Sequence, residues 1–205
     1  MGGGDRMAVY VTGDTHGDFR QIGDFCSVMG TKRDDVMIVL GDAGLNYFGD
    51  ERDIARKTGV SRTRMTYLMI HGNHEMRPAT VDRYRRVQWN GGMVYQEERF
   101  SNLLLVKDGE LYRLGGKDVL AIGGAYSVDK EYRLRMGYRW FSDEQPSDEI
   151  KEYVEQQLDK TGWKVDAVLS HTFPRKYEPV EHFMSGIDQS KVLISIYICN
   201  KRLHP

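Results

Sequence analysis

The sequence predicts a single-domain α/β fold in which parallel strands, with helices outside them, join an antiparallel meander. Three observations predict it. The chain has 205 residues, enough for one domain with a sizeable core. Near-continuous apolar runs alternate with helical segments in the first third, which is typical of parallel strands buried on both faces. Short strands punctuated by glycine pairs follow between residues 93 and 122.

The first third of the chain contains three buried strands separated by helices. The strands are expected at residues 7–12, 36–40 and 67–70. Apolar side chains fall on one face of a helix at residues 19–29, which Gly30 ends. A second, short helix is expected at residues 51–57, after a loop.

The middle of the chain predicts the meander. Four short strands are expected at residues 93–96, 103–107, 110–114 and 119–122. The dipeptide Asp108-Gly109 predicts a two-residue hairpin between the second and third of them. Residues 81–86 fit either a short helix or an ordered loop.

The last third begins with a long irregular stretch. Residues 125–146 show little periodicity and many aromatic and charged side chains, and loops of this length are usually functional or cover another part of the fold. Ser147 fits the N-cap of a helix that runs to about residue 158, and residues 163–170 predict one more strand. Residues 1–6 are expected to be a flexible leader.

Composition excludes some classes of function. The formal net charge of −1 gives no bulk electrostatic case for nucleic acid or an anionic membrane as partner. No segment approaches the roughly 20 apolar residues of a membrane span, and no signal peptide is evident. Cys26 and Cys199 lie far apart and fit free thiols in a reducing compartment, so a cytoplasmic location is expected. Homo-oligomerisation stays open.

Polar motifs follow four of the predicted strands. They are Gly13-Asp14-Thr15-His16-Gly17, Gly41-Asp42, Gly72-Asn73-His74-Glu75, and His171. Open α/β sheets place ligands at the carboxyl ends of their strands, and these donors suit Mn, Fe, Zn or Mg. Each residue alone has a structural alternative: Asp14 as a helix cap, Asp42 as a turn residue, and His171 as a hydrogen-bonded core histidine. Their conjunction favours a two-metal hydrolytic centre.

This ordered set, GDxHG, then GD, then GNHE, then a strand ending in histidine, resembles the calcineurin-like metallophosphoesterase superfamily. The chain is most similar to its compact single-domain bacterial and phage-associated members. The resemblance implies an α+β sandwich, with two packed mixed β-sheets flanked by helices, over residues 7–190. It places the site at the strand ends.

The resemblance also implies a ligand set and a mechanism. Its five metal ligands are Asp14 and His16 on one ion, Asn73 and His171 on the other, and Asp42 bridging both. His74 would stabilise developing charge or protonate the leaving oxygen. The implied cofactors are two divalent metal ions, with Mn favoured over Fe, Zn, Mg or Ni. The implied activity is that of a phosphodiesterase or broad-specificity phosphatase, through attack of a metal-bridging hydroxide on a phosphoester.

Two departures from the family pattern qualify this expectation. The protein phosphatases carry an arginine in a GDxxDRG motif, which residues 41–46 lack, so a protein phosphatase is not expected. Other arginines are candidate phosphate ligands, each with a solvated surface role as the alternative: Arg77, Arg133, Arg135 and Arg139.

The second departure is the absence of the family's C-terminal GHxH motif. Residues 191–205 form an atypical tail, expected to be truncated or frame-shifted, so each ion would lose one ligand. His182, His204 or a second chain are weaker candidates for the vacancy. The rival hypothesis is therefore a degenerate family member that acts as a binding scaffold.

Overall fold

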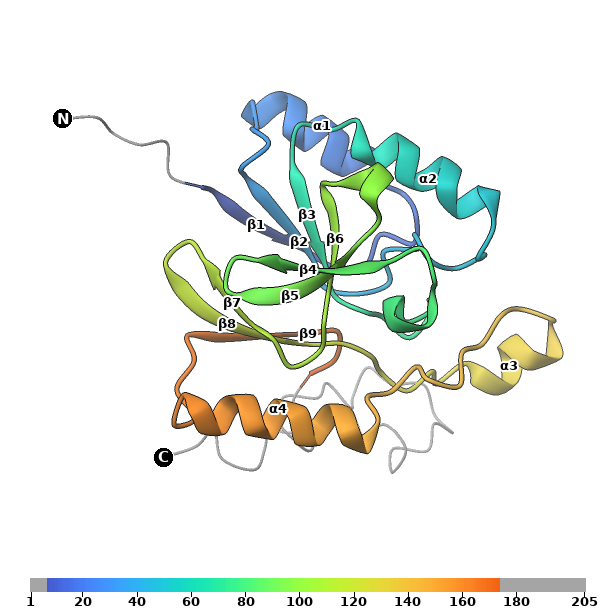
Figure 1. The fold of residues 1–205 in the computed structure, drawn as a ribbon. Coiled ribbons are helices and arrows are strands. Elements are labelled where there is room, and N and C mark those ends of the chain that lie inside the picture. Colours follow the sequence, from blue (N-terminus) through green and yellow to red (C-terminus); the bar gives the residue numbers. More distant parts are fainter. Residues whose placement is uncertain (1–6, 174–205) are drawn as a thin grey trace.

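The computed structural model describes residues 7–173, in which two β-sheets pack against each other between helices (Figure 1). The first sheet contains β1 (Val9–Thr12), β2 (Val36–Val39), β3 (Thr66–Met69), β4 (Arg85–Trp89), β5 (Gly92–Gln96) and β6 (Leu103–Val106). The second contains β7 (Leu111–Leu114), β8 (Lys117–Ile122) and β9 (Ala167–Ser170). The helices are α1 (Arg20–Met29), α2 (Glu51–Ser61), α3 (Lys130–Arg135) and α4 (Asp148–Lys160), with single 3-10 turns at Pro78–Thr80 and Glu98–Phe100.

Both sheets are mixed, as predicted. The six-stranded sheet has the order β1-β2-β3-β6-β5-β4, with β1, β2, β3 and β6 parallel and the β4–β5 and β5–β6 pairs antiparallel. In the three-stranded sheet, β8 pairs antiparallel with β7 and parallel with β9. The carboxyl ends of β1, β2 and β3 therefore meet at one edge, where the polar motifs follow.

Side chains point alternately to the two faces of each sheet, and this alternation divides the core into layers. On one face of the larger sheet, Met37, Tyr67 and Leu105 pack against residues of α1 and α2 such as Ile22 and Val60. The opposite face packs on the smaller sheet, whose outer face in turn packs on α4. Figure 1 shows the resulting order of helices, sheet, sheet and helix. This order confirms the α+β sandwich with helices on both outer faces.

The prediction of a hairpin at Asp108-Gly109 is wrong. The strands on either side, β6 and β7, belong to different sheets, so this turn is the crossing between them. Asp108 is held there by its own bonds, since Oδ1 accepts from the Gly123 backbone N–H at 2.6 Å and Oδ2 pairs with Arg77. A buried carboxylate partner, rather than pairing of the flanking strands, decides the path of this dipeptide.

The two-residue hairpins lie elsewhere. Asn90 and Gly91 join β4 to β5 with φ of 44° and 93°, and Gly115 and Gly116 join β7 to β8 with φ of 57° and 85°. Positive φ at both central residues is the turn whose twist matches a hairpin. The sequence prediction missed β4, because its Arg85-Arg86 start lacks an apolar run.

The remaining boundaries are close to expectation. Ser147 caps α4, since its hydroxyl accepts from the Ile150 backbone N–H at 3.3 Å. The irregular stretch at 125–146 contains the short helix α3, and α2 continues beyond the predicted residue 57 to Ser61. The predictions for residues 1–6, His182, His204 and the tail at 191–205 lie outside the described residues. Every helix between residues 7 and 173 is too short or too polar to cross a membrane.

Candidate metal centre

Asp42 lies at the centre of the converging motifs. It directly follows β2 and Gly41, has a φ of 44° and is 3% exposed. Its backbone carbonyl accepts from the N–H groups of Thr15 at 3.3 Å and His16 at 2.8 Å, which ties the first motif to the second. His16 also has a positive φ, 47°. Sparsely populated backbone conformations at non-glycine residues persist only where the surroundings fix them, often at functional sites.

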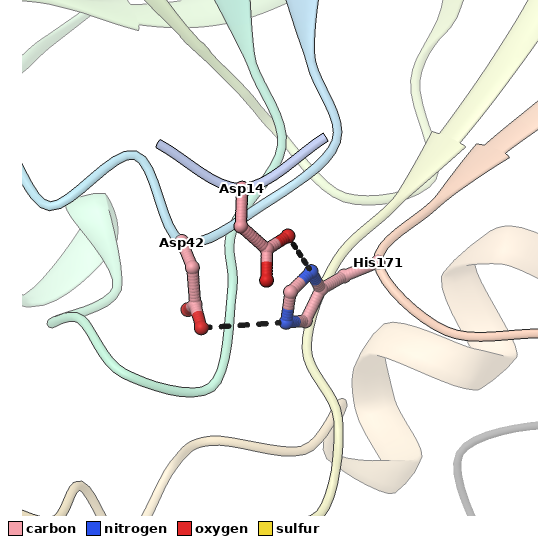
Figure 2. A group of neighbouring side chains, drawn as sticks. All are labelled: Asp14, Asp42 and His171. Carbon is pink, nitrogen blue, oxygen red and sulfur yellow. Dashed lines mark ion pairs between the residues drawn. The ribbon is translucent and has the colours of Figure 1, made fainter. Parts of the chain in front are cut away.

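Asp14, Asp42 and His171 converge on one point. Each offers a ligand atom, and these atoms all lie within 4.8 Å of one another. Figure 2 shows the imidazole of His171 facing both carboxylates. Its Nδ1 lies 3.7 Å from an oxygen of Asp14, and its Nε2 lies 3.7 Å from an oxygen of Asp42. These distances are too long for hydrogen bonds. Carboxylates and imidazole that face a common point without bonding each other fit a divalent metal ion.

The orientation of His171 fits the same interpretation. Its Nδ1 lies 2.8 Å from the carbonyl oxygen of Leu40, and its Nε2 lies 2.8 Å from Oδ1 of Asn73. When Nδ1 donates its proton to Leu40, Nε2 and the amide oxygen are two acceptors that face each other. Two ligands on one cation, each about 2.1 Å from it, have this separation of about 3 Å. Ser127 keeps the amide in place, because Asn73 Nδ2 donates to its hydroxyl at 2.8 Å.

The other two histidines predicted for the site, His16 and His74, flank this group. His16 Nε2 lies 3.7 Å from Asp14, on the open side, where its side chain is 61% exposed. The backbone N–H of His74 donates to Oδ1 of Asp42 at 2.9 Å, and its Nε2 lies 4.0 Å from Oδ2. Burial lowers the pKa of His74, and the neighbouring Asp42 opposes that shift. The structure thus brings together the five predicted ligands and His74.

Glu75 is a buried carboxyl group that bonds the backbone of the loops around the proposed centre, and the sequence analysis assigned it no role. It is 1% exposed and accepts from the backbone N–H groups of Gly72 and Gly44, each at 3.2 Å. Burial, with a smaller contribution from Asp42, raises the pKa of Glu75 to about 8. The carboxyl therefore joins the second and third motifs. An acidic residue directly after the GNH triplet was the available signal.

Two motif glycines are required by close approach. A Cβ on Gly72 would lie 2.0 Å from Oδ1 of Asp42, and a Cβ on Gly41 would lie 2.0 Å from Nδ1 of His171. Any side chain at either position displaces a proposed ligand. The glycines before Asp42 and Asn73 are therefore part of the geometry of the centre.

A cavity of about 300 Å³ opens beside Asp42. Its lining residues are His16, Asp42, Gly44, Tyr47, Phe48, Arg56, His74 and Arg133. Of the predicted phosphate ligands, Arg133 lies in this cavity. Arg56 also lies there and was missed, because its position within α2 carries no motif.

The other candidate arginines have different surroundings. Arg77 is 6% exposed, pairs with Asp108 and donates from Nε to the carbonyl of Asp143 at 2.6 Å. Arg135 is exposed, with its guanidinium 5.9 Å from the ring centroid of Tyr132. Neither lines the cavity beside Asp42.

The layered fold carries at its strand ends an Asp/Asp/His group, the residue types that hold divalent metal ions in proteins. A sequence model of the calcineurin-like phosphoesterase family matches residues 7–186, and the chain belongs to this family. Its members are generally hydrolases that cleave phosphoesters with divalent metals. A search of the curated proteins gave no match.

Proposed function

We propose that this protein hydrolyses phosphoesters at a centre of two divalent ions, with Mn²⁺ favoured. The observation that carries the proposal is the convergence of Asp14, Asp42 and His171 from the ends of three strands. The proposed ligand sets are Asp14 with His16, and Asn73 with His171, with Asp42 shared. The substrate class is a phosphodiester or a range of phosphate esters, since residues 41–46 lack the motif arginine of protein phosphatases.

Asp42 is suited to a shared position. One oxygen, Oδ1, is held by the backbone N–H of His74, while Oδ2 faces His171. The residue is nearly fully buried, so its carboxylate keeps one orientation. When bound, two divalent ions supply a water of lowered pKa and neutralise charge on the phosphoryl oxygens. Asn73 and His171 contribute an oxygen and a nitrogen already set 2.8 Å apart.

His74 lies where it can transfer a proton to a substrate in the cavity. It lines the cavity, its side chain is 19% exposed, and Nε2 lies 4.0 Å from both Asp42 and Asp129. The proposed role is to donate a proton to the leaving oxygen as the ester bond breaks. A positioned proton donor contributes typically ~10²–10⁴-fold to rate.

The experiment is a metal count joined to a substrate screen. Metal-free protein is titrated with Mn²⁺, and bound ions per chain are measured for the native sequence, for Asp42→Asn and for the control Asp118→Asn. Asp118 is an exposed carboxylate paired with Arg113, so its replacement should leave the count unchanged. Two ions per chain, reduced in Asp42→Asn together with hydrolysis of p-nitrophenyl mono- and diesters, is the expected result.

A different outcome would favour the scaffold hypothesis. Native protein that binds no Mn²⁺ would show that the convergent residues do not form a working centre. Full activity in Asp42→Asn would overturn the shared-ligand role even if ions bind.

A further inference from the structure

The cavity beside Asp42 contains two guanidinium groups that the metal centre does not use. Arg56 comes from α2 and Arg133 from α3, elements far apart in the sequence. Both are in a cavity that shares His16, Asp42 and His74 with the proposed centre. A substrate whose phosphorus lies at the metal ions therefore has its remaining oxygens within this cavity.

Arg56 is fixed against both metal-binding loops. Its Nη1 donates to the carbonyl of Gly44 at 2.8 Å, two residues after Asp42. A Cβ on Gly17 would lie 2.9 Å from its Cζ, so the guanidinium lies directly on the turn that follows His16. No carboxylate in residues 7–173 forms an ion pair with Arg56, in contrast to Arg52 one turn earlier, which pairs with Asp50 at 2.7 Å.

The ring of Phe48 helps to hold the side chain of Arg56 in place. Its Cζ lies 4.9 Å from the centroid of Phe48, and Arg52 lies 3.8 Å from the same centroid. Asp53 anchors this part of the loop to α2, because it accepts from the backbone N–H groups of Phe48 at 2.9 Å and Gly49 at 2.6 Å. These hydrogen bonds join α2, which carries Arg56, to the loop that carries Phe48.

Arg133 is held by the neighbouring ring. Its Cζ lies 6.0 Å from the centroid of Tyr47, and the rings of Tyr47 and Phe48 pack edge to face at 4.9 Å. Nε donates to the carbonyl of Arg139 at 3.0 Å, and Nη1 lies 3.4 Å from Asp129. Asp129 offsets part of the charge of Arg133, so Arg56 is the stronger free cation of the two.

We propose that Arg56, assisted by Arg133, forms a phosphate subsite that selects dianionic phosphomonoesters over monoanionic diesters. The inference rests on the proposed hydrolytic function and narrows its substrate class. A monoester has three non-bridging oxygens and a second negative charge, whereas a diester has two such oxygens and one charge. An arginine fork can bind this third oxygen together with one of the other two, and loss of a hydrogen bond to a charged group costs roughly tenfold or more in affinity.

The test measures binding of two small probes, so it does not require turnover. Inorganic phosphate and dimethyl phosphate are titrated calorimetrically into the Mn²⁺-loaded native protein, Arg56→Gln, Arg133→Gln and Arg52→Gln, at about pH 8, where phosphate is a dianion. Arg52→Gln is the matched control, because Arg52 stacks on the same ring but does not line the cavity. Arg56→Lys, which keeps the charge without the fork, is a second variant. Thermal unfolding verifies that each variant is folded.

The expected result is a native preference for phosphate that falls about tenfold or more in Arg56→Gln, less in Arg133→Gln, and not in Arg52→Gln. The ratio of kcat/KM for monoester over diester should fall in the same order. Equal phosphate affinity in Arg56→Gln and Arg52→Gln, or a native protein without preference between the probes, would overturn the inference. A native protein that holds no Mn²⁺ in the metal count would instead overturn the proposed function.

Discussion

Replacing Gly72 with alanine would force the new methyl group into Asp42. The added Cβ would lie 2.0 Å from Oδ1 of Asp42 and 2.2 Å from its backbone nitrogen. Real Cβ atoms essentially never approach within 3.0 Å, so the distance to Oδ1 must increase by at least 1.0 Å, from 2.0 to 3.0 Å, and the distance to the backbone nitrogen by at least 0.8 Å, from 2.2 to 3.0 Å. A misplacement of ~1 Å costs ~10²-fold in rate where geometry controls the reaction.

The assay compares kcat/KM and Mn²⁺ affinity in native protein, Gly72→Ala and Gly13→Ala. Gly13 occupies the matching place in the first motif, but a Cβ there meets no described atom within 4 Å. We expect a loss of ~10²-fold in Gly72→Ala and little change in Gly13→Ala, with thermal unfolding showing both folded. Near-native activity in Gly72→Ala would refute the claim that close approach of the loops fixes Asp42.

Three further substitutions test the buried ion pair, the Asp35 carboxylate and the role of His74. Lys57→Met leaves buried Glu97 without its ion-pair partner and should lower the free energy of urea unfolding by ~3–5 kcal/mol. The double variant Lys57→Met with Glu97→Leu should recover most of this loss. An unchanged free energy of unfolding in Lys57→Met would contradict the prediction. Hydrogen bonds from two backbone N–H groups lower the pKa of Asp35 below its ordinary value of 3.8. The stabilisation by this carboxylate is therefore complete above pH 3.8 and is lost as the pH falls through the lowered pKa, so the difference in unfolding free energy between native protein and Asp35→Ala should shrink in that range. A difference that does not change with pH would refute this prediction. His74→Ala should lower turnover by ~10²-fold or more while the Mn²⁺ count stays unchanged, whereas loss of ions would make His74 a ligand.

Most strands of the parallel half follow from the sequence because they are buried on both faces, whereas β1, at the edge of the sheet, is only partly buried. All four residues of β2 are buried, and an apolar run of this kind predicts a strand directly. The edge strand β4 behaves differently, since four of its five residues are exposed and its Arg85-Arg86 start gives no apolar run. Its place in the sheet depends on the adjacent Asn90-Gly91 turn, which pairs it with β5, and not on an apolar run within the strand itself.

The residues of the candidate site also differ in whether the sequence predicts them. Asp14, Asp42 and Asn73 follow parallel strands of one sheet within a few residues, so the chain direction places them at one edge. His171 follows β9 of the other sheet, so its approach to them also depends on how the two sheets pack. The supporting groups cannot be found by this rule. Arg56 reaches the cavity from the middle of a helix, and its role depends on where α2 packs.

The packing around Arg56 explains why an unpaired arginine is tolerated beside the proposed metal centre. Two divalent ions bring four positive charges against the two carboxylates of Asp14 and Asp42, and Arg56 adds a charge that no carboxylate in residues 7–173 offsets through an ion pair. A cation in such surroundings is repelled by the centre, so its position must be held by packing. The Gly44 carbonyl, the Gly17 turn and the Phe48 ring provide that packing. A dianionic phosphate relieves more of this repulsion than a monoanion does, so the electrostatics and the hydrogen-bonding geometry favour the same substrate class.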